Sequence, residues 1–208
     1  MMEYLPQLAL AWSIQLTGVL SPGPSVALIL GIATSQGRGA ALATVAGIGA
    51  ASIVLALATV LGIAVLVAQV AEVMTLIRWI GAAYLAWLAY GAFKKALAPP
   101  HLDPAAVPKA TPGQLAAMGF ALHLSNPKAI LFWLALAGVG GVGDAPASVV
   151  VLFVLGSFFN SIIGHAAWAL MLSSAPVRRV YQSARRGVET VLGGFYTAMA
   201  FGLATARS

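Results

Sequence analysis

The sequence predicts an all-α integral membrane protein with six transmembrane helices, arranged as two inverted three-helix repeats. Its first and fourth helices are expected to be broken at proline-containing motifs. Hydrophobic residues make up 61% of the 208 residues and charged residues only 8%, whereas soluble domains carry about 25% charged residues. Several apolar runs exceed the roughly 20 residues that a membrane-spanning helix needs. Prolines interrupt two of these runs half a chain apart, at Pro22 and Pro127.

Six apolar runs are predicted to span the bilayer. Their expected bounds are 6–35, 40–68, 75–93, 115–138, 147–174 and 188–206. The first run lacks a basic region before it and a cleavage site after it, so we expect a spanning helix rather than a signal peptide. Segment 94–114, rich in proline and alanine, is predicted to be an unstructured cytoplasmic linker. It joins repeat 1 (6–93) to repeat 2 (115–206) within a single transmembrane domain, 1–208.

Basic residues concentrate on one side of the predicted bundle. Eight of them fall on that side: Arg38, Lys94, Lys95, Lys109, Arg178, Arg179, Arg185 and Arg186. The other side has only Arg78 and Arg207, beside three acids. The positive-inside rule places the basic side in the cytoplasm and both termini outside. We therefore expect a multi-pass protein of the plasma (bacterial inner) membrane, with the lipid bilayer as a partner and halves of opposite orientation.

Matched segments support a repeat. Three pairs occur in the same order: the two prolines 105 residues apart, residues 47–52 with 156–161 at an offset of 109, and the Gly-x-x-Tyr segments 81–84 and 193–196 at an offset of 112. Slowly drifting offsets are what small loop differences between two repeats would produce. Chance similarity between helices rich in glycine and alanine is the alternative.

Each proline break looks like the start of a half-helix within the membrane. Ser21 and Asn126 are good N-cap residue types, and a proline follows each of them. A helix start presents unpaired N–H groups and a partial positive charge, so two facing starts would suit a carboxylate. The predicted substrate-binding residues are Ser21, Pro22, Gly23, Pro24, Ser25, Asn126, Pro127 and Lys128. The alternative is two proline kinks that only shape the helices.

Lys128 is the one charged residue among the predicted substrate-binding residues. It lies about eleven residues into the fourth run, roughly mid-membrane at 1.5 Å per residue, where a lysine costs about 2.5–3.5 kcal/mol on insertion scales. Glu72 and Glu189 are expected near helix ends, so no acid is predicted at that depth. The ammonium group could face a wet cavity, hold an anionic substrate or bond to carbonyls loosened by the break. Alternatively, the fourth helix starts late and the side chain snorkels to the interface.

Two histidines are candidates for proton coupling. His123 precedes the second break by three residues, and His165 follows Ser157 and Ser161 at four-residue spacing. Histidine titrates near neutral pH and could relay protons, whereas a buried interhelical hydrogen bond is the plainer interpretation. Two histidines without acids make a poor metal site, and the chain has no cysteine. We therefore expect no metal and no cofactor.

These segments resemble the LysE/RhtB family of amino-acid exporters. SPGPSVALIL looks like the family's TPGPN-type opening, and GRGAALATVAGIG is similar to its entry into the second helix. IRWIGAAYLAWLAYGAF resembles its G-A-x-Y-L segment, and GFALHLSNPKAILFWLA resembles its F-x-x-G-F…NPK-A-x-x-F segment. The resemblance covers the whole chain in length and order, and PGP together with NPK is its most specific part.

The resemblance implies a secondary active exporter of amino acids or close derivatives, not an enzyme, driven by proton exchange and working by alternating access. The residues that match the family's motifs, and that the resemblance implies are functional, are Pro22, Gly23, Pro24, Asn126, Pro127 and Lys128. Ser25 and His123 depart from these motifs, since asparagine is common at both positions. Some members have an acid early in the second helix, where this chain has Ala50 and Ala51. A desolvated cationic side chain would need such a charge, so we expect small neutral or apolar amino acids.

Other functions remain alternatives at this point. A metal or inorganic-ion carrier of related architecture would want acids, histidines or cysteines in the membrane. A membrane electron carrier would need paired cysteines, and a scaffold would give no reason for paired breaks. The net charge of +6 arises from loops, so we expect no nucleic-acid partner. The sequence leaves a homodimer open.

Overall fold

The computed structural model describes residues 2–67, 71–99, 107–138 and 145–205, and every regular element in them is a helix. After a short 3-10 helix at Met2–Tyr4, the α-helices are α1 (Leu5–Leu20), α2 (Pro24–Ser35), α3 (Arg38–Val67), α4 (Ala71–Leu97), α5 (Pro112–Ser125), α6 (Pro127–Gly138), α7 (Ala147–Leu172) and α8 (Ala175–Thr205).

Both predicted breaks are confirmed. The first apolar run divides into α1 and α2, which are bent by 51° relative to one another. The fourth run divides into α5 and α6 around Asn126. Proline explains both interruptions, because its ring nitrogen cannot donate to the preceding turn. The unbroken runs 40–68 and 147–174 agree with α3 and α7 to within a few residues.

The expected start of the last helix is wrong. We predicted a span over 188–206, but α8 begins at Ala175 and contains four arginines assigned to a loop: Arg178, Arg179, Arg185 and Arg186. Pro176 lies in the first turn, where proline is tolerated. Arginines interspersed with apolar residues then make an amphipathic helix that hydropathy alone does not detect.

The predicted linker is also shorter than expected. Lys94 and Lys95 lie in the last turn of α4, and α5 begins at Pro112. Thr111 caps α5, since its hydroxyl accepts from Gln114 N while the Gln114 side chain accepts from Thr111 N. Residues 100–106 of the linker lie outside the described residues, as do Asp144 and Arg207.

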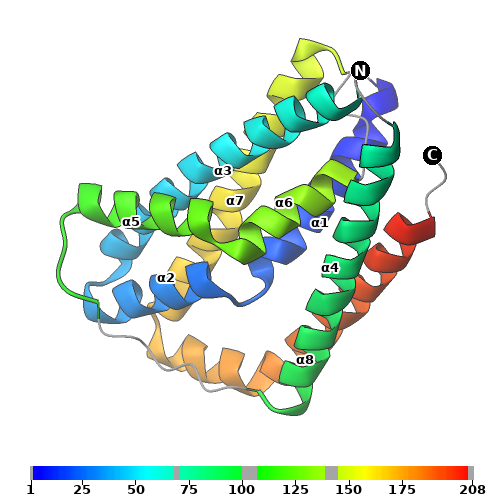
Figure 1. Ribbon diagram of the computed structural model, residues 1–208. Helices are drawn as coiled ribbons and strands as arrows, with labels where there is room; N and C mark the ends of the chain where they lie inside the picture. The colour runs from blue at the N-terminus through cyan, green and yellow to red at the C-terminus, as the bar shows by residue number, and fades with distance from the viewer. Residues whose placement is uncertain (1, 68–70, 100–106, 139–144, 206–208) are drawn as a thin grey trace.

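The broken helices lie between two helix pairs (Figure 1). α3 packs on α7, and α4 packs on α8. α1 and α2 contact α7, α5 contacts α3, and α6 contacts α4. The start of α3, the end of α4 and the start of α8 lie at one end of the molecule (Figure 1). Basic residues therefore gather at that end, and its cytoplasmic placement stays a prediction.

Segments that the sequence pairs make matching contacts. Ser52 Oγ donates to Ser161 Oγ at 2.8 Å, and these serines end the segments aligned at an offset of 109. A Cβ on Gly47 of α3 would lie 1.8 Å from Ala116 O of α5. A Cβ on Gly156 of α7 would lie 2.3 Å from the Trp12 ring of α1. Paired glycines therefore let α5 and α1 approach α3 and α7 in corresponding ways.

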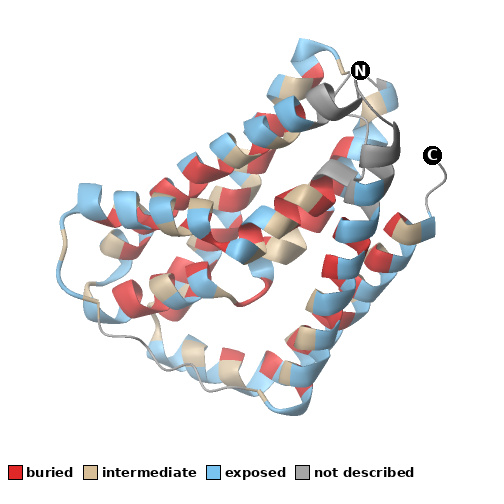
Figure 2. Ribbon diagram, in the orientation of Figure 1, coloured by how far each residue is buried: buried red, intermediate tan, exposed pale blue. Residues whose placement is uncertain are grey.

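Buried residues line the inner faces of the helices, while many outer faces carry exposed apolar side chains (Figure 2). The most exposed large ones include Leu61, Trp87, Tyr90, Ile163, Val180, Val191 and Phe201. Such surfaces suit lipid rather than water. Among the described helices, α3 and α7 are long and apolar enough to cross a membrane, and α1 with α2 makes a third span if counted together. The expected number of six stays a prediction.

Candidate functional site

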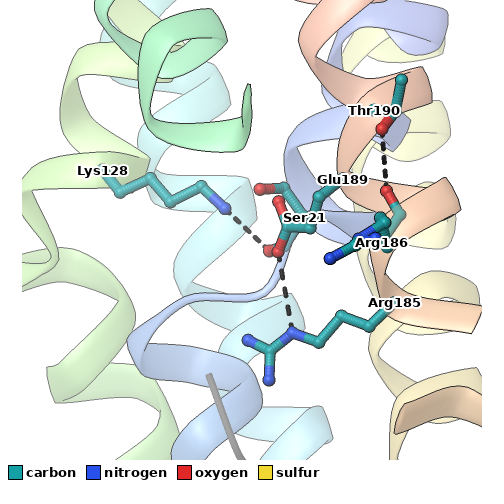
Figure 3. A network of polar contacts seen from close by, with 6 residues as sticks. All are labelled: Ser21, Lys128, Arg185, Arg186, Glu189 and Thr190. Carbon is teal, nitrogen blue, oxygen red and sulfur yellow. Dashed lines mark hydrogen bonds and ion pairs between the residues drawn. The ribbon is translucent and has the colours of Figure 1, made fainter. Parts of the chain in front are cut away.

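Lys128 links the two breaks. Pro22 has no N–H to donate to Gly18 O, and the chain is extended at Ser21. The Lys128 ammonium supplies donors instead, reaching Gly18 O at 3.2 Å and Ser21 O at 2.7 Å. Figure 3 shows the contact with Ser21. Of the roles proposed for this lysine, bonding to loosened carbonyls is the one that these contacts show.

Side chains from α7 and α8 hold the same end of α1. The last carbonyls of a helix have no partner within it. Trp168 Nε1 donates to Val19 O at 3.1 Å, and Tyr196 Oη donates at 3.0 Å to Thr17 O, which also accepts from Ser21 N. With Lys128 from α6, three helices thus satisfy the carbonyl end of α1. The break is therefore a stabilised feature rather than a loose kink.

At the second break, Asn126 caps the helix that follows, α6. Asn126 Oδ1 accepts from Lys128 N at 3.0 Å, so the prediction that Asn126 caps the second half-helix is confirmed. The Lys128 carbonyl also accepts from Tyr84 Oη at 3.0 Å. The backbone N–H of Lys128 is therefore already bonded, and Lys128 offers no free backbone donor to a ligand. Ala129 is the next donor of that first turn.

The corresponding prediction for Ser21 is wrong. Ser21 is the C-cap of α1, and Gly23 occupies the N-cap position of α2 without a side-chain cap bond. Pro24 takes the first helical position, so the cap falls on the glycine between the two prolines. A Cβ on Gly23 would lie 3.2 Å from Lys128 Cδ and 3.4 Å from its Nζ. The glycine thereby leaves room for the lysine to cross the break.

Two cavities meet at these breaks, and together they are lined by all ten predicted site residues. One, of about 50 Å³, has Ser25, His123 and His165 in its wall. The other, of about 360 Å³, has the three prolines of the motifs in its wall. Four residues line both cavities: Ser21, Gly23, Asn126 and Lys128. The breaks therefore form the partition between two hollow regions of the bundle.

The histidines come together in the smaller cavity. Their rings lie edge to face with centroids 5.8 Å apart. His123 Nε2 lies 3.3 Å from Ser52 Oγ, and His165 Nδ1 lies 2.9 Å from Ser161 O. His123 Nδ1 is buried with no hydrogen-bond partner among the described residues. The cluster thus combines one interhelical contact, one contact within α7 and one ring nitrogen available to a water or a ligand.

Sequence reasoning missed Glu189 as part of the site. We expected it near a helix end, but α8 starts earlier, and the side chain is 0% exposed and lines the larger cavity. Lys95, assigned to a loop, lines the same cavity. Arg185 Nε lies 3.8 Å from Glu189 Oε1. The four-residue spacing of this pair on an amphipathic segment was the available clue.

The chain matches a known family of membrane proteins. The model of the LysE type translocators matches residues 16–207. The chain belongs to this family. The expected resemblance is thereby confirmed, and the protein is a transporter rather than an enzyme.

Curated relatives span nearly the same length as this translocator. The threonine efflux protein of Salmonella typhi is 27% identical over 205 residues, covering 93% of this chain and 95% of that protein. The threonine efflux protein of Escherichia coli (strain K12) is 27% identical over 200 residues, with the same coverage. The uncharacterized membrane protein YahN of that strain is 27% identical over 178 residues, covering 83% and 78%. No solved structure matches the chain.

Proposed function

We propose that this translocator exports small neutral amino acids, threonine among them, from the bacterial cytoplasm across the inner membrane. The observation that carries the proposal is the meeting of two half-helix starts and one half-buried lysine at the partition between two cavities. The family and the threonine efflux relatives support the substrate class. The absence of an acid at Ala50 and Ala51 favours a neutral side chain.

The substrate carboxylate would bind beside Lys128. Two of the three ammonium donors are bonded to carbonyls, so one remains for an anion. The N–H groups of Ser25 and Val26 lie in the first turn of α2, where no intrahelical acceptor exists. Both residues line the smaller cavity. A carboxylate there would meet backbone donors and the positive end of a helix dipole.

Alternating access would come from rocking one three-helix half against the other. The proposed halves, α1–α4 and α5–α8, would be inverted repeats that meet at Ser52 and Ser161. Each chain supplies both half-sites, so the proposal does not require a homodimer.

Proton exchange would drive export through the histidine cluster. The smaller cavity, of about 50 Å³, has room for a few waters, each of which needs about 10–15 Å³. His123 Nδ1 would bond to such a water. In the part of the chain that the structure describes, no group of three His, Cys, Asp or Glu residues could hold a metal ion. No specific observation therefore favours the ion-carrier alternative.

Transport by purified protein in liposomes would test the proposal. Vesicles preloaded with labelled threonine should release it faster than protein-free vesicles, and an imposed proton gradient should accelerate release. Unlabelled small neutral amino acids should compete, and arginine should not. Release of divalent cations but of no amino acid would refute the proposed substrate class. Alkaline phosphatase fused after residue 208 should be active if the C-terminus lies outside.

A further inference from the structure

The larger cavity is lined by side chains of opposite charge. Lys128 and Lys95 line it from α6 and α4, and Glu189 lines it from α8. Its volume of about 360 Å³ falls in the range of about 300–1,000 Å³ found for small-molecule sites. The cavity therefore has the size and the charges for a small zwitterion.

Glu189 is buried without the contacts that a carboxylate normally has. Its side chain is 0% exposed, and neither oxygen has a hydrogen-bond partner among the described residues. Arg185 Nε at 3.8 Å provides an ion pair, but that separation exceeds hydrogen-bond length. An ionised carboxylate can accept about four hydrogen bonds, and burying one without them is costly. The side chain is therefore placed to receive a donor that enters the cavity.

The carbonyl groups at the first break could in principle bind a substrate amino group, but they are already bonded. Gly18 O and Ser21 O both accept from Lys128 Nζ. Lys128 and Glu189 point toward one another from opposite sides, with Ser21 between them (Figure 3). A substrate whose carboxylate meets Lys128 would thus direct its amino group toward Glu189.

We infer that Glu189 binds the α-ammonium group of the substrate and selects amino acids over carboxylic acids that lack this group. The inference rests on the proposed function and deepens it. An ammonium group offers three donors, and a carboxylate facing it offers enough acceptors for all of them. Lys128 binds the other end of the zwitterion, so a ligand that lacks the ammonium group loses one of the two charged contacts.

Binding to the full-length protein in detergent would test this role. The probes are L-threonine and 3-hydroxybutyrate, which has the same carbon chain and hydroxyl but no amino group. Wild-type protein should prefer threonine by about tenfold or more, a factor equivalent to 1.4 kcal/mol. Glu189→Gln should lose this preference by weakening threonine binding while leaving 3-hydroxybutyrate binding unchanged. Equal weakening of both ligands, or an intact preference, would overturn the inference.

A merely structural role makes different predictions. If Glu189 only neutralises Arg185, then Arg185→Gln combined with Glu189→Gln should restore the preference for threonine, whereas a substrate ligand cannot be restored in this way. If Glu189→Gln does not fold, Glu189→Asp tests the same point. The shorter side chain should weaken threonine binding and spare 3-hydroxybutyrate. Failure of wild-type protein to bind either probe would refute the proposed function itself, and this inference with it.

Discussion

The approach of α3 to α5 makes Gly47→Ala a demanding test of the fold. The added Cβ would lie 1.8 Å from Ala116 O, about half the 3.4–4 Å of ordinary contact. The obstacle is backbone, so no rotamer change relieves it, and the two helices must separate. Overpacking costs about 1–3 kcal/mol and sometimes more, and we expect a loss of about 3 kcal/mol. For a chain of this size that corresponds to a fall of about 6–12 °C in melting temperature.

Gly62→Ala in the same helix provides the matched control. A Cβ at Gly62 would meet nothing within 4 Å, so alanine should stabilise the protein by about 0.4–1 kcal/mol through reduced freedom of the unfolded chain. Melting of the two variants would be followed by fluorescence in the same detergent. If Gly47→Ala melts as high as Gly62→Ala, then α5 does not pack on α3 as described, and the proposed correspondence with Gly156 loses its basis.

Substitutions of Lys128, Asn126 and Ser161 probe the breaks and the contact between α3 and α7. Lys128→Met removes two charge-assisted hydrogen bonds of about 1.5–3 kcal/mol each, so the melting temperature of this variant should fall. The control Lys94→Met changes an exposed lysine and should melt like wild type. Equal melting temperatures of the two variants would show that Lys128 does not stabilise the break. Asn126→Ala should destabilise the protein by about 1 kcal/mol through loss of the cap, and Asn126→Asp should retain stability; two identical losses would contradict the capping role. Ser161→Ala should cost about 0.5–1.5 kcal/mol by removing the bond to Ser52, and an unchanged melting temperature would count against a close contact there.

The sequence was sufficient for the features that proline and hydropathy govern. The breaks at Pro22 and Pro127 follow from the missing N–H groups, and the long apolar runs locate α3 and α7. All ten predicted site residues line the two cavities, because a break in a buried helix leaves backbone groups that must be satisfied locally. The alignment at an offset of 109 matched the segments that contain Ser52 and Ser161, but it did not predict that these serines bond to one another.

Features that depend on the direction of side chains could not be predicted from the sequence. The arginines near residue 180 were assigned to a loop because average hydropathy does not take the periodicity of an amphipathic helix into account. Glu189 was consequently placed at a helix end, although it lies deep in the bundle. The bonds of Lys128 depend on which carbonyls α1 leaves free and on how closely α6 approaches them. Neither quantity can be read from residue spacing.

The crossing of Lys128 over Gly23 bears on why both halves belong to one polypeptide. Gly23 precedes Lys128 by 105 residues, the offset that also separates Pro22 and Pro127. In an assembly of two identical three-helix subunits, both central positions would hold the same amino acid. Two lysines would repel one another, and two glycines would leave the carbonyls of the break without a donor. In the proposed inverted repeat, one polypeptide that contains both halves lets one position carry the cation and the equivalent position make room for it.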